Sequence, residues 1–83
     1  MKQSILQNLC YTDLVYSRIN KKLGTNLSRN DIEVLIHDAL TATGANDIVR
    51  NGKNYYASCD KHNMKITINS RTFRVITVDR IKQ

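Results

Sequence analysis

Apolar residues in the first part of the chain recur at helical spacing. A first short helix is indicated by Ile5, Leu6 and Leu9. A second helix is predicted from about Asp13, with Thr12 as its cap and Gly24 at its end. Its apolar stripe repeats every four residues and consists of Tyr11, Val15, Ile19 and Leu23. The spacing therefore favours two helices before residue 25.

A third helix is predicted after Ser28. This serine precedes Asp31 by three residues, a spacing that resembles a capping box. An amphipathic pattern then extends to about Thr43, with apolar positions at Ile32, Leu35, Ile36, Ala39 and Leu40. We expect Gly44 to end this helix in the left-handed conformation, as Gly24 ends the helix before it.

The pattern changes to alternation after Gly44 and predicts four strands, at residues 47–50, 53–59, 64–68 and 73–81. Asn51 and Gly52 separate the first two strands and predict a hairpin with a type I′ turn, because both residues tolerate positive φ. The last strand is β-branched on both faces from Val75 to Val78. This is typical of a central or doubly covered strand.

These elements predict one α+β domain over residues 1–83, with two to three N-terminal helices followed by a four-stranded antiparallel meander. No apolar run is long enough to span a membrane, and the N-terminal residues do not resemble a signal peptide. We therefore expect a cytoplasmic protein with no membrane partner.

The chain carries 13 Lys and Arg, 7 Asp and Glu, and a formal net charge of +6. Residues 1–46 are nearly neutral, with 5 cations and 4 acids, whereas residues 47–83 have 8 cations and 3 acids. A basic strand half attracts polyanions, so RNA or another nucleic acid is one expected partner and an acidic protein surface is the other. A solubilising surface explains the same charge.

The predicted sheet has a polar face that suits RNA. If Met64, Ile66 and Ile68 face the helices, the residues between them face outward, with Arg74 and Arg80 beside them. Cations bind phosphates, and an outward tyrosine stacks on bases. The candidate nucleic-acid-binding residues are Lys53, Tyr55, Tyr56, Lys65, Asn69 and Arg71.

The sequence contains few motifs that indicate metal, cofactor or nucleotide chemistry. The histidines and cysteines lack the paired spacing of zinc ligands, and there is no phosphate-binding or dinucleotide-binding glycine motif. We expect no metal, no cofactor and no disulfide. His62 lies in a predicted turn close to Lys61 and Lys65, where a neutral imidazole can accept a proton.

Helices followed by a basic meander resemble the small bacterial ribonuclease toxins of the RelE, colicin and barnase kind. The resemblance is architectural and is sharpest at Gly52–Tyr56 and Ile66–Ile81. It implies RNA cleavage without metal in a toxin–antitoxin setting, with cations stabilising the transition state. The positions that fit catalytic roles are His62, Arg74 and Arg80.

A second resemblance spans most of the chain. It rests on Tyr11–Ile19, Gly52–Tyr56, Ile66–Ser70 and Val75–Val78. These segments resemble an uncharacterised family of small proteins from Gram-positive bacteria. The resemblance implies a bacterial, phage or mobile-element origin and no established activity.

Two other functions stay open at this point. A phage or mobile-element inhibitor, anti-defence or antitoxin-like, would bind a host protein without catalysis and explain the same size and charge. A winged-helix DNA binder is less favoured, because the third helix carries Asp31, Glu33 and Asp38, which repel phosphate. An unpaired edge strand also allows a homodimer.

Overall fold

The computed structural model describes residues 1–82. Its helices are α1 (Lys2–Asn8), α2 (Asp13–Leu23) and α3 (Arg29–Ala42), followed by the short 3-10 helix η1 (Ala45–Asp47). Its strands are β1 (Ile48–Asn51), β2 (Asn54–Cys59), β3 (Met64–Asn69) and β4 (Val75–Arg80). All neighbouring strands are antiparallel, in the order β1-β2-β3-β4. The predicted α+β fold with a four-stranded meander is confirmed.

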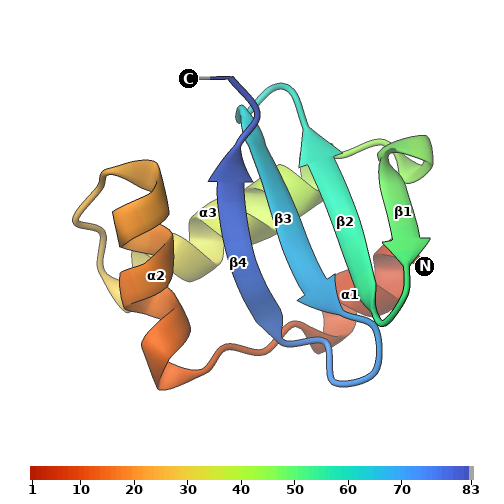
Figure 1. The fold of residues 1–83 in the computed structure, drawn as a ribbon, viewed down its shortest axis with the longest axis horizontal. Helices are drawn as coiled ribbons and strands as arrows, with labels where there is room; N and C mark the ends of the chain where they lie inside the picture. Colours follow the sequence, from red (N-terminus) through yellow and green to blue (C-terminus); the bar gives the residue numbers. More distant parts are fainter. Residues whose placement is uncertain (83) are drawn as a thin grey trace.

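The sheet is covered by helices on one face only. Helices α1 and α3 lie behind the sheet in Figure 1, and α2 runs alongside β4. The other face, which we call the open face, carries no helix (Figure 1). This arrangement follows from the sequence pattern, because a half-buried antiparallel strand alternates between a core side and a solvent side.

The core lies between the helices and the covered face of the sheet. One buried row crosses all four strands in register and consists of Ile48, Ala57, Ile66 and Val78. The helices contribute a complementary buried set, Val15, Ile19 and Leu23 from α2 and Ile32, Ile36, Ala39 and Leu40 from α3. Met64, Ile66 and Ile68 are buried among them, as the alternation predicted.

The C-terminal end of α2 and the start of α3 agree with their sequence signals, whereas Thr12 occupies the N-cap position of α2 without a side-chain cap hydrogen bond. Gly24 follows α2 with φ of 68°, and its N–H donates to the carbonyl of Asn20. The Ser28 side chain accepts a hydrogen bond of 3.1 Å from the N–H of Asp31. The left-handed glycine and the serine cap are both confirmed.

The end of α3 differs from the prediction. Gly44 has φ of −67° and precedes η1 instead of forming a left-handed cap. A lysine explains the difference, because Lys2 Nζ in α1 donates to the carbonyls of Thr41 and Thr43, each at 2.8 Å. A cation at the helix C-terminus satisfies these carbonyls and offsets the helix dipole, so no left-handed residue is needed.

The hairpin between β1 and β2 is confirmed, but its turn is not type I′. Asn51 pairs with Asn54, which leaves Gly52 and Lys53 as the two central residues. Positive φ occurs at Gly52, at 64°, and at neither Asn51 nor Lys53. Glycine at the first central position is the pattern of a type II′ turn. The pairing therefore places the lysine side chain at the tip of the hairpin.

The apolar run of β4 predicted a central or doubly covered strand, and the central position is wrong because β4 forms an edge of the sheet. Its register with β3 shifts between Thr67 and Ile68, which leaves Ile76 as an extra residue. A bulge of this kind breaks the alternation and lets Val75 and Val78 both reach the core. The apolar run thus reflects a bulge and not a sheet position.

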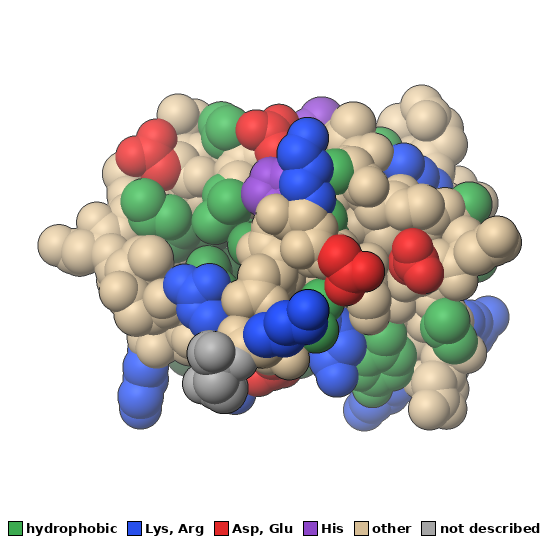
Figure 2. All heavy atoms as spheres, turned by 90° about the horizontal axis from the view of Figure 1, so that it is seen from above, with side chains coloured by type: hydrophobic (Ala, Val, Ile, Leu, Met, Phe, Trp, Pro, Cys, Tyr) green, Lys and Arg blue, Asp and Glu red, His purple; other side chains and the backbone are tan. Residues whose placement is uncertain are grey.

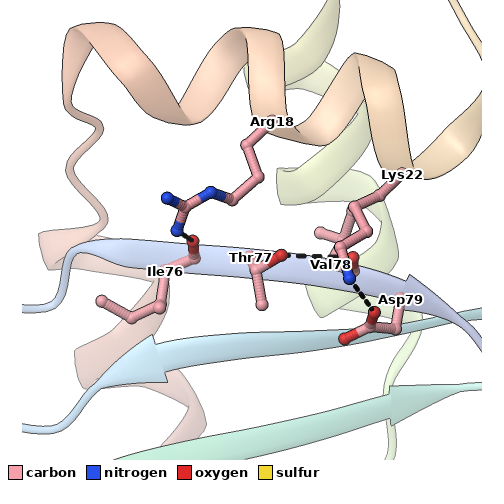
Figure 3. A network of polar contacts seen from close by, with 6 residues as sticks. All are labelled: Arg18, Lys22, Ile76, Thr77, Val78 and Asp79. Carbon is pink, nitrogen blue, oxygen red and sulfur yellow. Dashed lines mark hydrogen bonds and ion pairs between the residues drawn. The ribbon is translucent and has the colours of Figure 1, made fainter.

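Helix α2 covers the outer edge of β4. Figure 3 shows Arg18 reaching the carbonyl of Ile76 at 3.3 Å and Lys22 reaching the carboxylate of Asp79 at 2.9 Å. Further along, Arg80 Nη2 donates to the carbonyl of Leu23 at 2.7 Å. Charged side chains over an edge strand discourage pairing with another chain, so β1 is the accessible edge of this sheet within residues 1–82.

Candidate nucleic-acid interface

Two turns meet at one end of the sheet and form the strongest candidate site. They are the β1–β2 turn and the β3–β4 turn, both at the bottom of Figure 1. Ser70 joins them, because its N–H and its Oγ donate to the carbonyl of Lys53 at 2.8 and 2.9 Å. This link fixes the two turns next to each other, and we call the region the turn end.

The β3–β4 turn is built by Asn69. Its Oδ1 accepts from the backbone N–H groups of Arg71 at 2.8 Å and Thr72 at 2.9 Å. Asparagine favours turns for this reason, since its side chain replaces a backbone acceptor. Phe73 then adopts a positive φ of 61° and packs against Tyr55, with ring centroids 6.5 Å apart. The anchored turn leaves Arg71 exposed.

A hollow of about 510 Å³ lies at the turn end. Three of its lining residues are cations and none is an acid; the lining consists of Arg50, Lys53, Asn69, Ser70, Arg71 and Thr72. Within residues 1–82 the ion pairs are Lys22 with Asp79 and Arg29 with Asp13, so the cations of the hollow have no acidic partner there. Unpaired cations around a hollow with hydroxyl and amide groups suit a phosphate-bearing ligand.

The positive charge of the strand half is concentrated at this end. Four cations lie there, namely Arg50, Lys53, Arg71 and Arg74, and none of the acids of residues 47–82 lies at this end. The opposite end holds the β2–β3 turn, and Figure 2 shows acidic side chains among its cations. Asp60 lies in that turn beside Lys61. Between the two ends of the sheet, the turn end therefore attracts a polyanion more strongly.

The open face of the sheet begins beside the hollow. Asn54 is paired in register with both Asn51 and Asn69, so three asparagines form a row across β1, β2 and β3. Tyr56 lies two residues further along β2 on the same face, with Lys65 Nζ 6.0 Å from its ring centroid. Polar amides, a ring and a lysine thus share one face.

Some candidate residues lie away from this interface. Tyr55 is on the core side, where it packs against Phe73, so the aromatic residue of the open face is Tyr56. Arg80 is in register with buried Met64, so its side chain leaves the strand on the core side and reaches α2 instead of joining the open face. Thr67 is on the open face but only 6% exposed.

The three catalytic candidates do not form one site. His62 lies in the β2–β3 turn, with Nδ1 3.4 Å from the Sγ of buried Cys59, and Arg80 lies at the same end of the sheet. Arg74 precedes β4 at the turn end, six residues and about 20 Å of strand from Arg80. General acid–base chemistry needs its groups within hydrogen-bond reach of one substrate, and these three are too far apart for that.

Arg50 is the residue of the hollow that sequence reasoning missed. It precedes the Asn51-Gly52 pair, and its Nε donates to the carbonyl of Gly52 at 3.4 Å. The hairpin signal marks its neighbourhood, but the link between Ser70 and Lys53 has no signature in the sequence. Reading the cations on both sides of each predicted turn would have included Arg50.

A second hollow, of about 400 Å³, lies among residues of α1 and α3 and differs in charge. Its lining includes Leu6, Leu9 and Val34 together with the acids Glu33 and Asp38. Burial raises the pKa of Tyr11 in this hollow, and the Glu33 carboxylate raises it further. Tyr11 thus stays neutral, and the acids make this hollow unsuited to a polyanion.

Two further features of residues 1–82 bear on function. No group of three or more His, Cys, Asp and Glu side chains in this range is placed to hold a metal ion. None of the helices in the same range combines the length and the apolarity that crossing a bilayer requires.

The fold and the site define a small α+β domain with an open-faced antiparallel meander and a basic turn end. Residues 3–79 match the model of a family described as protein of unknown function, DUF3781. The chain belongs to this family, which confirms the prediction of an uncharacterised family. No curated protein matches the chain. No solved structure matches it either.

Proposed function

We propose that this protein binds nucleic acid, and RNA in particular, by holding the phosphodiester backbone at the turn end. The observation that carries the proposal is the hollow lined by Arg50, Lys53 and Arg71 without an acid. Guanidinium groups bind phosphate in bidentate fashion, and a lysine adds a point charge. Ser70 and Thr72 supply hydroxyl groups of the kind that contact phosphate oxygens.

The proposed binding is not catalytic. His62 and Arg74 lie at opposite ends of the sheet, and Arg80, which shares the end of His62, donates its Nη2 to the carbonyl of Leu23. Neither arginine is therefore placed to act with His62 on one substrate. His62 also lies beside the thiol of Cys59, in a turn that includes Asp60. The function that the geometry supports best is therefore retention of RNA, not its cleavage.

The test is a gel retention experiment with labelled single-stranded RNA at low and moderate salt. We expect wild-type protein to retain the RNA intact. The triple variant Arg50→Gln, Lys53→Gln, Arg71→Gln should bind on the order of 100-fold more weakly, since each lost charged contact is worth about 1 kcal/mol.

A matched variant separates the site from net charge. Lys21→Gln, Lys61→Gln and Lys82→Gln remove the same charge from exposed residues outside the hollow. This control should bind nearly as well as wild type. Equal losses in both triple variants, or no retention by wild type, would overturn the proposal, and the second outcome would direct attention to an acidic protein partner. Cleavage that disappears in Arg74→Ala would overturn the non-catalytic assignment.

A further inference from the structure

The open face of the sheet holds one aromatic ring at a position where a nucleic-acid base can reach it. Among residues 1–82 the other aromatic side chains are engaged elsewhere. Tyr11 stacks on Tyr16 with centroids 5.5 Å apart, and Tyr55 packs against Phe73 on the core side. Tyr56 is half-buried, and it lies on the open face because its neighbour Ala57 faces the core in register with buried Ile66.

From this placement we infer that the ligand is single-stranded and that one of its bases stacks on Tyr56. The inference rests on the proposed function and deepens it by naming the class of nucleic acid. A base can stack on a side chain only when it is free of its own helical neighbours, so the arrangement selects an unpaired strand.

The neighbours of Tyr56 suit a stacked nucleotide. Lys65 Nζ lies over the ring, 6.0 Å from its centroid, and a stacking base would displace this exposed lysine toward the phosphate next to it. Asp79, which is in register with Lys65, is held by Lys22 at 2.9 Å, so this acid is already paired. On the β1 side, Val49 is paired with Tyr56 and is 56% exposed, which extends the apolar surface beside the ring.

A path leads from the hollow to this ring. Lys53 and Tyr56 are three residues apart on one hairpin, about 10 Å along the strand, which a short stretch of single strand spans. The asparagine row lies between them. Asn54 Oδ1 is buried and has no hydrogen-bond partner among residues 1–82, so the row includes one acceptor that the fold leaves unsatisfied.

The alternative of a duplex ligand fits the surface less well. The bases of duplex RNA are stacked and paired, so a side chain cannot stack on them, and proteins recognise such a duplex by its shape and backbone. The helices lie behind or beside the sheet, and α3 presents the exposed acids Asp31, Glu33 and Asp38. The open face offers a surface on which an unpaired base can stack.

The absence of tryptophan from the sequence permits a direct test. Tyr56→Trp introduces a single tryptophan. Its fluorescence should be quenched when an unlabelled single-stranded oligoribonucleotide is added. Leu14→Trp, at a position 76% exposed on α2 and outside the proposed path, is the control and should show little quenching. Binding without quenching at position 56 would overturn the inference.

Affinity measurements provide the second arm of the test. Tyr56→Leu keeps an apolar side chain but removes the ring, and it should weaken single-strand binding by about 5- to 150-fold, whereas Tyr56→Phe should bind as wild type. Wild type and Tyr56→Leu should bind an abasic oligonucleotide of the same length with equal affinity, because this ligand has no base to stack on the ring. Duplex RNA should compete poorly with the single strand.

The outcomes distinguish the inference from the proposed function. If Tyr56→Leu binds as wild type while the triple variant of the hollow does not, the backbone site stands and the stacking inference is overturned. If wild type retains no RNA, both are overturned. If duplex RNA competes as well as the single strand, the inference of a single-stranded ligand is overturned, while the proposed binding of RNA stands.

Discussion

Gly52 shows how one residue shapes the candidate site. It has φ of 64° at the first central position of the β1–β2 turn, and a Cβ there would meet nothing within 4 Å. The requirement for glycine is therefore conformational and not steric. The same turn brings Lys53 to the hollow, where Ser70 holds its carbonyl.

Gly52→Ala should lower the free energy of unfolding by about 1 to 2 kcal/mol, because a side chain is strained at this φ. Urea denaturation followed by circular dichroism measures the change. Gly44→Ala is the matched control, since Gly44 has φ of −67° and its added Cβ would lie 3.3 Å from the mobile end of the Asp47 side chain. Equal losses in the two variants would contradict the conformational explanation.

At the scale of elements, the contact between α2 and β4 decides which sheet edge is accessible. The polar contacts between α2 and β4 contribute unequally to the free energy of unfolding. Lys22 and Asp79 form a surface ion pair with side chains 49% and 42% exposed, so the pair contributes little. Arg80 satisfies the carbonyl of Leu23 at the end of α2, where helix carbonyls lack internal partners.

We expect Arg80→Met to cost about 1 to 2 kcal/mol of stability and Asp79→Asn at most about 0.5 kcal/mol. The physical reason is that the first change leaves a partly buried carbonyl without its donor, while the second breaks a screened pair. Urea denaturation at low and high salt checks both values, with Lys82→Met as a control for loss of a nearby cation. A cost for Arg80→Met no greater than that of the control would contradict the structural role.

At the scale of the whole molecule, positive and negative side chains are distributed unequally between the two ends of the sheet. The strand half has 8 cations and 3 acids in residues 47–83, yet its acids, Asp47, Asp60 and Asp79, all lie away from the hollow. The net charge of +6 attracts any polyanion at long range, whereas the hollow makes close contacts. Salt dependence separates these two contributions.

The logarithm of RNA affinity should fall with the logarithm of salt concentration at a slope of about −2, which corresponds to about three phosphates neutralised on a single strand. Titrations by fluorescence anisotropy at several salt concentrations give this slope. The triple variant of the hollow should have a much shallower slope, because only contacts outside the hollow such as that of Lys65 are left, and the charge-matched triple variant should keep the wild-type slope. The same reduced slope in both variants would assign binding to net charge alone.

The sequence predicted the elements well because their signals are local. Periodicity marked α2 and α3, Ser28 marked the start of α3, and alternation marked β3. The errors occurred where a distant residue decides the geometry. Lys2 replaces the glycine cap of α3, and the shift of register between β3 and β4 explains the apolar run of β4.

The candidate site was only partly accessible to sequence reasoning. Lys53, Asn69 and Arg71 were named as nucleic-acid-binding residues, and the structure places all three around one hollow. Arg50 was missed, and the sequence left open whether Tyr55 or Tyr56 points outward, which the structure decides in favour of Tyr56. Alternation shows that neighbours face opposite ways but does not show which one faces the core.

The sequence by itself determined the order of helices and strands, the hairpin, and the excess of positive charge in the strand half. These properties depend on spacing, turn residues and composition, all of which can be read along the chain. The predicted meander also implies that its first and third turns lie at one end of the sheet, but only the tertiary structure decided that Ser70 is hydrogen-bonded to Lys53, 17 residues earlier. The tertiary structure also placed Arg74 and His62 at opposite ends of the sheet. The distance between them depends on strand length and register, which the composition of the chain does not contain.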